Sequence, residues 1–219
     1  DNISKQLTSS EIDFEILCIN NASTDKTEQI LKTYEQTHFF VKYLNSENKI
    51  GYGVAIRHGL QYFQGKFVII VMADGSEEPK DIVKIYRQLE KGYDCVSGQR
   101  FLRKENIKGY PKLKLFLNRL GNQLISKIIK SDATDLTYGF KGYRREKLQD
   151  LRPLVSEGFN VNLEIFLNVH FSGALISEVE TNWKERTSGT TKFKLLRECR
   201  LNLGTFLAEF YKNKIRNNP

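Results

Sequence analysis

Short apolar runs alternate with helix-length amphipathic segments through the first half of the chain. The runs expected to form strands are residues 12–19, 39–44, 66–72 and 93–97. The segments expected to form helices between them are residues 28–34, 51–63 and 79–91. This alternation favours an α/β fold with a mostly parallel sheet flanked by helices, because parallel strands need crossover connections. Ligands of such sheets bind at the carboxyl ends of the strands, so polar residues that follow the runs are candidates for a site.

The second half of the chain is less regular. Apolar residues recur at helical spacing in residues 111–130 and 195–215, with basic residues between them, which is typical of amphipathic helices. Residues 158–170 are expected to form another helix, and residues 174–183 a strand. No repeat or linker interrupts the sequence, so we expect a single domain over residues 1–219. No apolar run reaches the roughly 18 residues of a membrane span.

The cysteines exclude two common kinds of small scaffold. Cys18, Cys95 and Cys199 lie far apart and form no Cys-x-x-Cys pair. A disulfide framework and a structural zinc site are therefore not expected, and a reducing, cytoplasmic setting fits best.

The charge is unevenly distributed. Residues 1–98 hold 11 Lys/Arg and 14 Asp/Glu, a net charge of −3, whereas residues 99–219 hold 23 and 12, a net charge of +11. A basic half suits nucleic acid, an anionic membrane surface or a phosphate-bearing substrate, and an ordinary Lys-rich surface is the alternative. Because the sequence has no zinc finger, RNP-type motif or aromatic-basic ribbon, we expect no nucleic-acid partner.

The most apolar run is followed by an acidic turn. Ala73 and Asp74 come directly after residues 66–72, and Pro79 sits where a helix can begin. A carboxylate at this position is suited to Mg²⁺ or Mn²⁺, which also contacts substrate phosphates. The alternative is that Asp74 only forms the turn with Gly75 or caps the next helix.

Other polar segments allow similar pairs of interpretations. Asn20, Asn21 and Ser23 follow residues 12–19 and could bind a nucleobase or ribose, or they could form a helix cap and an Asx turn. The Gly-x-Gly at residues 51–53 lacks the further residues of a dinucleotide or P-loop motif, which disfavours both classes. Arg186 and Lys192 could clamp a phosphate, or belong to a solvated loop.

The order of these segments resembles the family 2 glycosyltransferases, particularly the polyprenol-phosphate branch typified by dolichol-phosphate mannose synthase. The resemblance extends from about residue 14 to residue 194. The blocks that carry it are residues 14–27, 48–59, 72–79, 98–100, 135–145 and 186–192.

The resemblance implies a GT-A fold that transfers a sugar, with inversion, from a GDP- or UDP-sugar to a polyprenyl (dolichyl- or undecaprenyl-like) phosphate. It implies that Asp74 holds the divalent cation and acts with Arg186 in catalysis. The residues implied at the donor are Asn20, Asn21, Ser23, Gly51, Ala73 and Asp74. The residues implied at donor or acceptor phosphates are Arg100, Arg119, Glu164, Arg186 and Lys192.

Three departures from the family pattern affect these expectations. Met72 stands where an Asp-x-Asp motif has its first carboxylate, and Asn20-Asn21 replace an acidic pair. The family's first strand is apparently missing, and residues 1–7 look like the end of the helix that should follow it. The alternative function is therefore a catalytically impaired GT-A-fold binding or scaffold subunit.

The same resemblance implies a location. A polyprenyl phosphate acceptor places the protein at the cytosolic face of a membrane, as a peripheral protein. The amphipathic segment 195–215, with Lys212, Lys214 and Arg216, could lie on that surface, or it could pack against the sheet or a partner. The sequence does not indicate an oligomeric state.

Overall fold

The computed structural model describes residues 1–46, 49–101, 107–108, 112–149, 151, 153–184 and 195–217. Its strands are β1 (Ile16–Asn20), β2 (Val41–Asn45), β3 (Phe67–Ile69), β4 (Cys95–Gln99), β5 (Ile107–Lys108), β6 (Lys141–Arg144), β7 (Ile176–Glu180) and β8 (Trp183–Lys184). Its helices are α1 (Asn2–Ser9), α2 (Thr27–Thr37), α3 (Tyr52–Tyr62), α4 (Pro79–Glu90), α5 (Lys112–Ile129), α6 (Arg145–Gln149), α7 (Val161–Phe171) and α8 (Leu195–Asn217).

The central sheet has four strands in the order β3-β6-β4-β7. β6 is antiparallel to both of its neighbours, whereas β4 and β7 are parallel. β3 and β4 therefore run in the same direction, and only β6 is reversed within this sheet. The expected α/β fold is confirmed, with a mixed central sheet.

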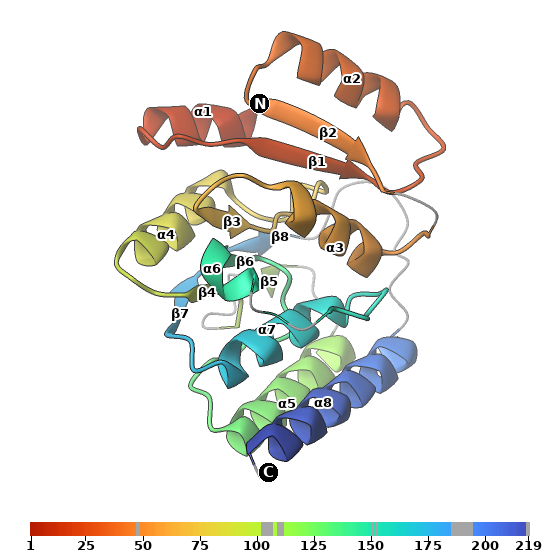
Figure 1. Ribbon diagram of the computed structural model, residues 1–219, viewed down its shortest axis with the longest axis vertical. Coiled ribbons are helices and arrows are strands. Elements are labelled where there is room, and N and C mark those ends of the chain that lie inside the picture. The colour runs from red at the N-terminus through yellow and green to blue at the C-terminus, as the bar shows by residue number, and fades with distance from the viewer. Residues whose placement is uncertain are drawn as a thin grey trace.

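β1 and β2 form a separate parallel pair at the upper end of the molecule (Figure 1). In the described part of the chain, no strand hydrogen-bonds both to β1 and to β3. The sheet is thus divided between β1 and β3. Of residues 1–7, expected to be helical, residues 2–7 lie in α1 and Asp1 is its N-cap.

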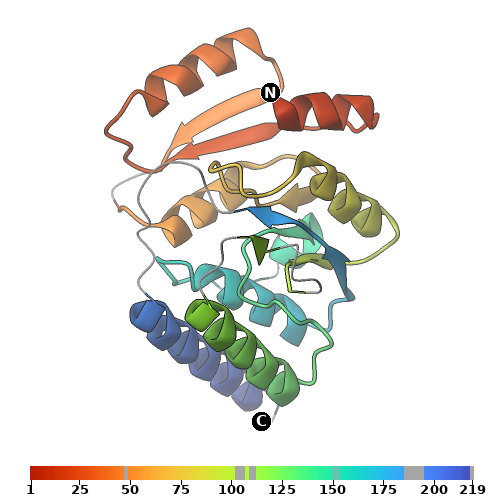
Figure 2. The ribbon, with the colours of Figure 1, turned by 180° about the vertical axis from the view of Figure 1, so that it is seen from behind.

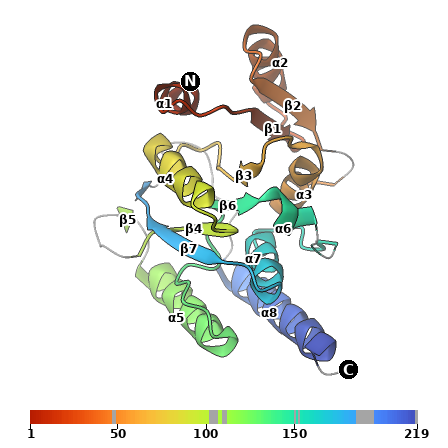
Figure 3. The same ribbon diagram turned by 60° about the vertical axis from the view of Figure 1, so that its left-hand side comes forward.

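Helices cover both faces of the central sheet (Figure 3). On one face, α4 packs with α1 over a core that includes Ile85, Leu89 and Val96. On the other face, α7 is buried on nearly all sides, and its buried residues include the polar Asn162 and Glu164. α5 and α8 contribute Ile125 and Phe206 to the same core as α7, and both lie at the lower end of the molecule in Figures 1 and 2.

Cys18, Cys95 and Cys199 are free cysteines. Within the described residues, no helix is both long and apolar enough to cross a bilayer.

Candidate active site

The turn after β3 carries the acidic residue that the sequence singled out. One carboxylate oxygen of Asp74 accepts a hydrogen bond from the Ser76 amide at 3.0 Å, and Gly75 follows with a φ of 70°, a conformation that suits glycine. The Asp74 side chain is exposed, and the N-terminus of α4 has no side-chain cap. Asp74 therefore forms the turn and still presents its carboxylate to solvent, while it does not cap α4.

Glu77 is a second carboxyl group in the same turn, and it is buried. Its Oε1 accepts a hydrogen bond from the Tyr138 hydroxyl at 3.2 Å, whereas its Oε2 is buried without a hydrogen-bond partner in the described residues. Burial, together with the negative charge of Asp74, raises the pKa of Glu77 to about 7. This carboxyl group can therefore gain or lose its proton near neutral pH.

The raised pKa of Glu77 should appear as a pH dependence of stability. Above its unfolded pKa of 4.5 the unfolded chain loses the proton, while the folded protein keeps it until pH approaches 7. The free energy of unfolding is therefore expected to fall by about 3 kcal/mol as pH rises through this window. Because Glu77 is buried, solvent screens this effect little. Glu77→Gln should remove this decrease. Urea unfolding at pH 5 and pH 8 measures this decrease. An equal change in the free energy of unfolding between the two pH values in wild type and Glu77→Gln would contradict the raised pKa of Glu77.

Arg100 lies in a buried ion pair at the end of β4. Its Nε and Nη2 donate to the two oxygens of Asp135 at 2.8 and 3.1 Å, and its guanidinium lies 3.8 Å from the centre of the Tyr138 ring. Only 7% of Arg100 is exposed. Contact of Arg100 with a substrate phosphate stays a prediction, but the structure shows that the guanidinium already has a carboxylate partner.

Lys141 supports the loop that holds this ion pair. It is fully buried, and its Nζ donates to the carbonyl oxygens of Asp135 at 3.1 Å and Leu136 at 3.0 Å and to that of Tyr138. Burial, opposed in part by the charge of Asp135, lowers the pKa of Lys141 to about 8. The lysine is thus a structural cation beneath residues 135–138.

The two asparagines after β1 connect neighbouring loops. Asn20 is buried; its Nδ2 donates to Asn45 at 2.7 Å, and its Oδ1 accepts from the Ser23 amide at 3.2 Å. Asn21 accepts from the Gly51 amide at 2.7 Å and donates to Ser46. The structure brings together these two residues, which are predicted to bind the nucleotide-sugar donor, and their side chains hold the loops after β1 and β2. Contact with a donor stays a prediction.

Gly51 is required where the chain approaches residues 156–158. A Cβ on Gly51 would collide with the Glu157 carbonyl, and one on Gly53 with the Ser156 carbonyl. The Gly53 amide also donates to the Glu157 carbonyl at 2.8 Å. The two glycines of this Gly-x-Gly thus allow the close backbone contact.

Glu164 holds the same segment from below. It is almost fully buried in α7, and its two oxygens accept from the Val155 amide at 2.8 Å and the Ser156 amide at 2.9 Å. The structure therefore places Glu164 beneath residues 155–156, with both oxygens engaged by the backbone.

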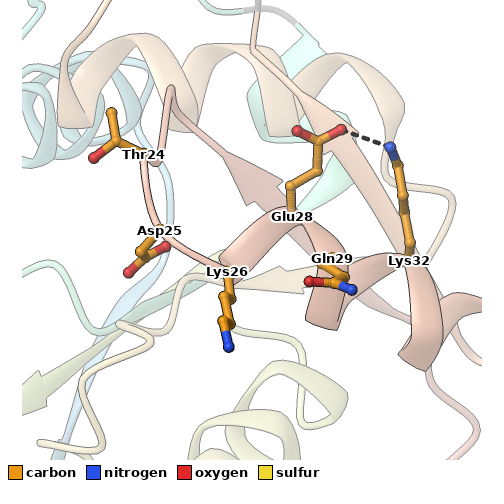
Figure 4. A pocket seen from close by; sticks show the side chains of 6 residues that line it. All are labelled: Thr24, Asp25, Lys26, Glu28, Gln29 and Lys32. Atoms are coloured by element: carbon orange, nitrogen blue, oxygen red, sulfur yellow. Dashed lines mark ion pairs between the residues drawn. The ribbon is translucent and has the colours of Figure 1, made fainter.

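The remaining predicted residues lie in several places. Ala73 is exposed beside Asp74. Arg119 of α5 donates from Nη2 to the Phe101 carbonyl at 2.7 Å, next to the end of β4. Arg186 and Lys192 lie outside the described residues. A surface hollow of about 580 Å³ at the start of α2 is lined by Thr24, Asp25, Lys26, Glu28, Gln29 and Lys32 (Figure 4). It contains none of the predicted site residues.

The residues at the Asp74 turn fit a cation that is held mainly by its substrate. Within the described ranges, no group of three or more His, Cys, Asp or Glu side chains could hold a metal ion. Asp74 offers one exposed carboxylate, and Met72 offers no oxygen ligand. Mg²⁺ is usually bound through one or two carboxylates together with substrate phosphates, so this donor set is compatible with a cation that arrives with a diphosphate.

Four residues of this site were given no role from the sequence. Glu77, Asp135, Tyr138 and Lys141 lie within the motif blocks at residues 72–79 and 135–145. Their position in those blocks was the one sequence feature that could have marked them as site residues. The Asp135–Arg100 and Tyr138–Glu77 contacts span 35 and 61 residues of sequence, which local patterns do not reveal.

The fold is that of a GT-A-type protein, the nucleotide-sugar transferase class. Residues 1–152 match the family model described as Glycosyl transferase family 2. The chain therefore belongs to this glycosyltransferase family.

Curated relatives agree with the family assignment. The chain is 28% identical over 210 residues to the glycosyltransferase AglJ of Haloferax volcanii, covering 93% of the chain and 64% of AglJ. It is 26% identical over 187 residues to the polyprenol monophosphomannose synthase of Mycolicibacterium smegmatis, covering 81% of the chain and 69% of that protein. The chain thus spans about two thirds of the length of these relatives.

Solved structures show the same fold. Glucosyl-3-phosphoglycerate synthase from Mycobacterium tuberculosis, in complex with Mn²⁺, UDP and phosphoglyceric acid, superposes with a TM-score of 0.68 at 16% identity. The match covers 94% of this chain and 70% of that one. A complex of the same enzyme with Mn²⁺ and UDP-glucose gives a TM-score of 0.68 over 95% of this chain and 74% of that one.

Proposed function

We propose that the chain is a single GT-A catalytic domain that transfers a sugar from a GDP- or UDP-sugar to a polyprenyl phosphate, with inversion at the sugar. The observation that carries the proposal is the exposed Asp74 carboxylate in the turn after β3, in a chain of this family. The similarity to a polyprenol monophosphomannose synthase supports the choice of acceptor.

The charges at the site suit this reaction. A lipid phosphate is an anionic nucleophile near neutral pH, so the enzyme needs positioning and charge stabilisation more than a strong base. Asp74 would hold Mg²⁺ or Mn²⁺ against the donor diphosphate, and the bound cation would offset the charge of the leaving group. Arg119, Arg186 and Lys192 are proposed phosphate contacts. Glu164, with both oxygens on backbone amides, is proposed to shape the site through residues 155–156.

A donor screen followed by a transfer assay tests the proposal. Thermal unfolding is measured with Mn²⁺ and a panel of nucleoside diphosphate sugars, and transfer is then measured to a water-soluble short-chain polyprenyl phosphate. We expect Mn²⁺-dependent stabilisation by a GDP- or UDP-sugar and formation of the lipid-linked sugar. Absence of both with the full panel would contradict the proposal.

The alternative of an impaired binding subunit rests on specific side chains. Met72 removes one carboxylate from the expected metal motif, and Asn20 and Asn21 are engaged with neighbouring loops. An impaired subunit would bind the nucleotide sugar without forming product, so the same assay distinguishes the two functions.

We also propose that α5 and α8 rest on the cytosolic face of a membrane. Ten of the sixteen exposed large apolar side chains of the described residues lie on these two helices. They are Leu113, Phe116, Leu120, Leu124, Ile128, Leu196, Leu203, Leu207, Tyr211 and Ile215. Their spacing of mostly four residues forms one stripe along each helix, opposite the side that packs on the core.

The charges beside these stripes favour an anionic bilayer. Every exposed charged side chain of α5 and α8 is Lys or Arg, whereas their two acidic residues, Glu198 and Glu209, are buried. A second copy of the same face would bring like charges together, which disfavours self-association. An apolar stripe flanked by cations is typical of a helix lying in a membrane interface.

Vesicle flotation tests the membrane surface separately from catalysis. We expect binding to vesicles with phosphatidylglycerol, weaker binding at high salt, and at least about a tenfold loss in Leu203→Gln/Leu207→Gln, because two leucines no longer enter the lipid. Phe39→Gln, at a 95% exposed residue beside β2, is the control. Equal binding of both variants, or dimerisation through α8, would contradict the proposal.

A further inference from the structure

The Asp74 turn is tied to a distant part of the chain by one side-chain contact. The Tyr138 hydroxyl donates to Glu77 Oε1 at 3.2 Å across 61 residues of sequence, and both side chains are more than nine-tenths buried. The backbone of Glu77 also forms an isolated bridge with Trp183. Glu77 is therefore a fixed point of the segment between β3 and α4, three residues after Asp74.

The contact continues into a buried network of polar side chains. The Tyr138 ring lies against the Arg100 guanidinium at 3.8 Å, Arg100 pairs with Asp135, and Lys141 binds the carbonyls of residues 135, 136 and 138. The network holds two cations and two carboxyl groups, so its charges are balanced when Glu77 is ionised. Asp135 and Lys141 are engaged by these contacts, and a buried network of this kind can hold the segments that it joins in one arrangement.

At the Asp74 end of this network, far fewer contacts restrain the backbone. Asp74 and Gly75 are exposed, and the hydrogen bond that the Asp74 side chain makes within the described ranges is to the Ser76 amide. A turn of this kind can move unless a neighbouring residue is anchored, because few buried contacts restrain it.

We propose that Glu77 and Tyr138 are positioning residues that fix the Asp74 turn in the arrangement that binds a divalent cation and the donor diphosphate. The proposal rests on the proposed function. Loss of the contact lowers the fraction of protein in the competent arrangement, and apparent affinity falls by the same factor. Saturating cation and donor restore that arrangement, so the expected effect is on the Mn²⁺ and donor affinities more than on kcat.

Tyr138→Phe isolates the contact, because it removes the hydroxyl and keeps the ring against Arg100. Tyr86→Phe is the matched control: the Tyr86 hydroxyl donates to Glu90 Oε1 at 2.9 Å on the exposed side of α4. Mn²⁺ binding in the presence of GDP or UDP, read from the electron paramagnetic resonance of free Mn²⁺, gives affinity without activity. Hydrogen exchange of residues 72–78 reports the turn itself.

For Tyr138→Phe we expect about a tenfold weaker Mn²⁺ affinity, a similar rise in donor KM, and faster exchange at residues 72–78, with kcat changed much less. Tyr86→Phe should change none of these. A decrease in kcat alone, or exchange and affinity equal to wild type, would overturn the proposal. If Tyr138→Phe does not fold, Glu77→Ala removes the same contact from the other side, and exchange at residues 73–76 decides. Wild-type protein without Mn²⁺-dependent nucleotide binding would instead count against both the function and this proposal.

Discussion

Asp74→Ala is expected to reduce sugar transfer by at least about a hundredfold, because a preorganised charge at the reacting centre typically contributes a factor of this size. Asp74 is the exposed carboxylate of the turn after β3, and Met72 cannot replace it as an oxygen ligand. The measurement is the initial rate of transfer at fixed donor and acceptor, with Mn²⁺ varied. Added Mn²⁺ should recover part of the lost rate if the residue binds the cation.

Asp74→Asn separates the charge from the turn. The amide oxygen of asparagine can still accept the hydrogen bond from the Ser76 amide, and asparagine is well tolerated in such turns. We expect Asp74→Asn to fold like wild type and to lose nearly as much activity as Asp74→Ala. Full activity in Asp74→Asn would mean that the residue only shapes the turn, and the cation assignment would then be wrong.

Asp135→Ala is expected to lower the free energy of unfolding by about 3–5 kcal/mol, which is typical of removing one partner from a buried ion pair. Asp135 is fully buried, and the Arg100 side chain that it binds is only 8% exposed. The variant would leave this guanidinium without its carboxylate in a site with little access to water. Urea unfolding measures the loss, and Glu28→Ala, which breaks the exposed Glu28–Lys32 pair, is the comparison with a much smaller effect.

A double variant separates burial of the charge from loss of the pair. Arg100→Met/Asp135→Leu removes both charges and keeps most of the side-chain volume, so it should be more stable than Asp135→Ala. An Asp135→Ala protein as stable as wild type would show that Arg100 finds other partners without cost. In that case the ion pair would not hold the end of β4.

The sequence predicted the elements whose apolar pattern is long enough to be informative. The helix expected at residues 79–91 is α4, which begins at Pro79, and the helix expected at residues 195–215 is α8. The strand expected at residues 12–19 is shorter and later, as β1, because only its second half pairs with β2.

The reversed strand β6 was not predicted, for a physical reason. Its sequence, Lys-Gly-Tyr-Arg, is short and polar, yet Lys141 is buried against three carbonyls. Gly142 lies so close to α4 that a Cβ would collide with Ile85. Gly142 has its role through a tertiary contact with α4, and Lys141 has its role through the carbonyls of the preceding loop; no periodicity in the sequence encodes either one.

The candidate site shows the same division. Asp74 could be singled out because a strand-to-helix transition is visible locally. The sequence could not show that Asp135 already binds Arg100, or that Asn21 holds the Gly51 loop, since these pairs are 35 and 30 residues apart. Contact of Arg100 and Asn21 with ligands stays a prediction, and the structure adds that both side chains also have internal partners.

The division of the strands between two sheets has a consequence for how the molecule opens. Five residue pairs join β1 to β2, and none of them belongs to the ladder of the four-stranded sheet. We expect the β1–β2 layer, which also packs against α3, to open as its own cooperative unit at a lower free energy than global unfolding. β1 ends at Asn20, next to Asn21, which binds the Gly51 amide. Opening of the β1–β2 layer would therefore loosen the proposed nucleoside side of the site while the Arg100–Asp135 side stays intact.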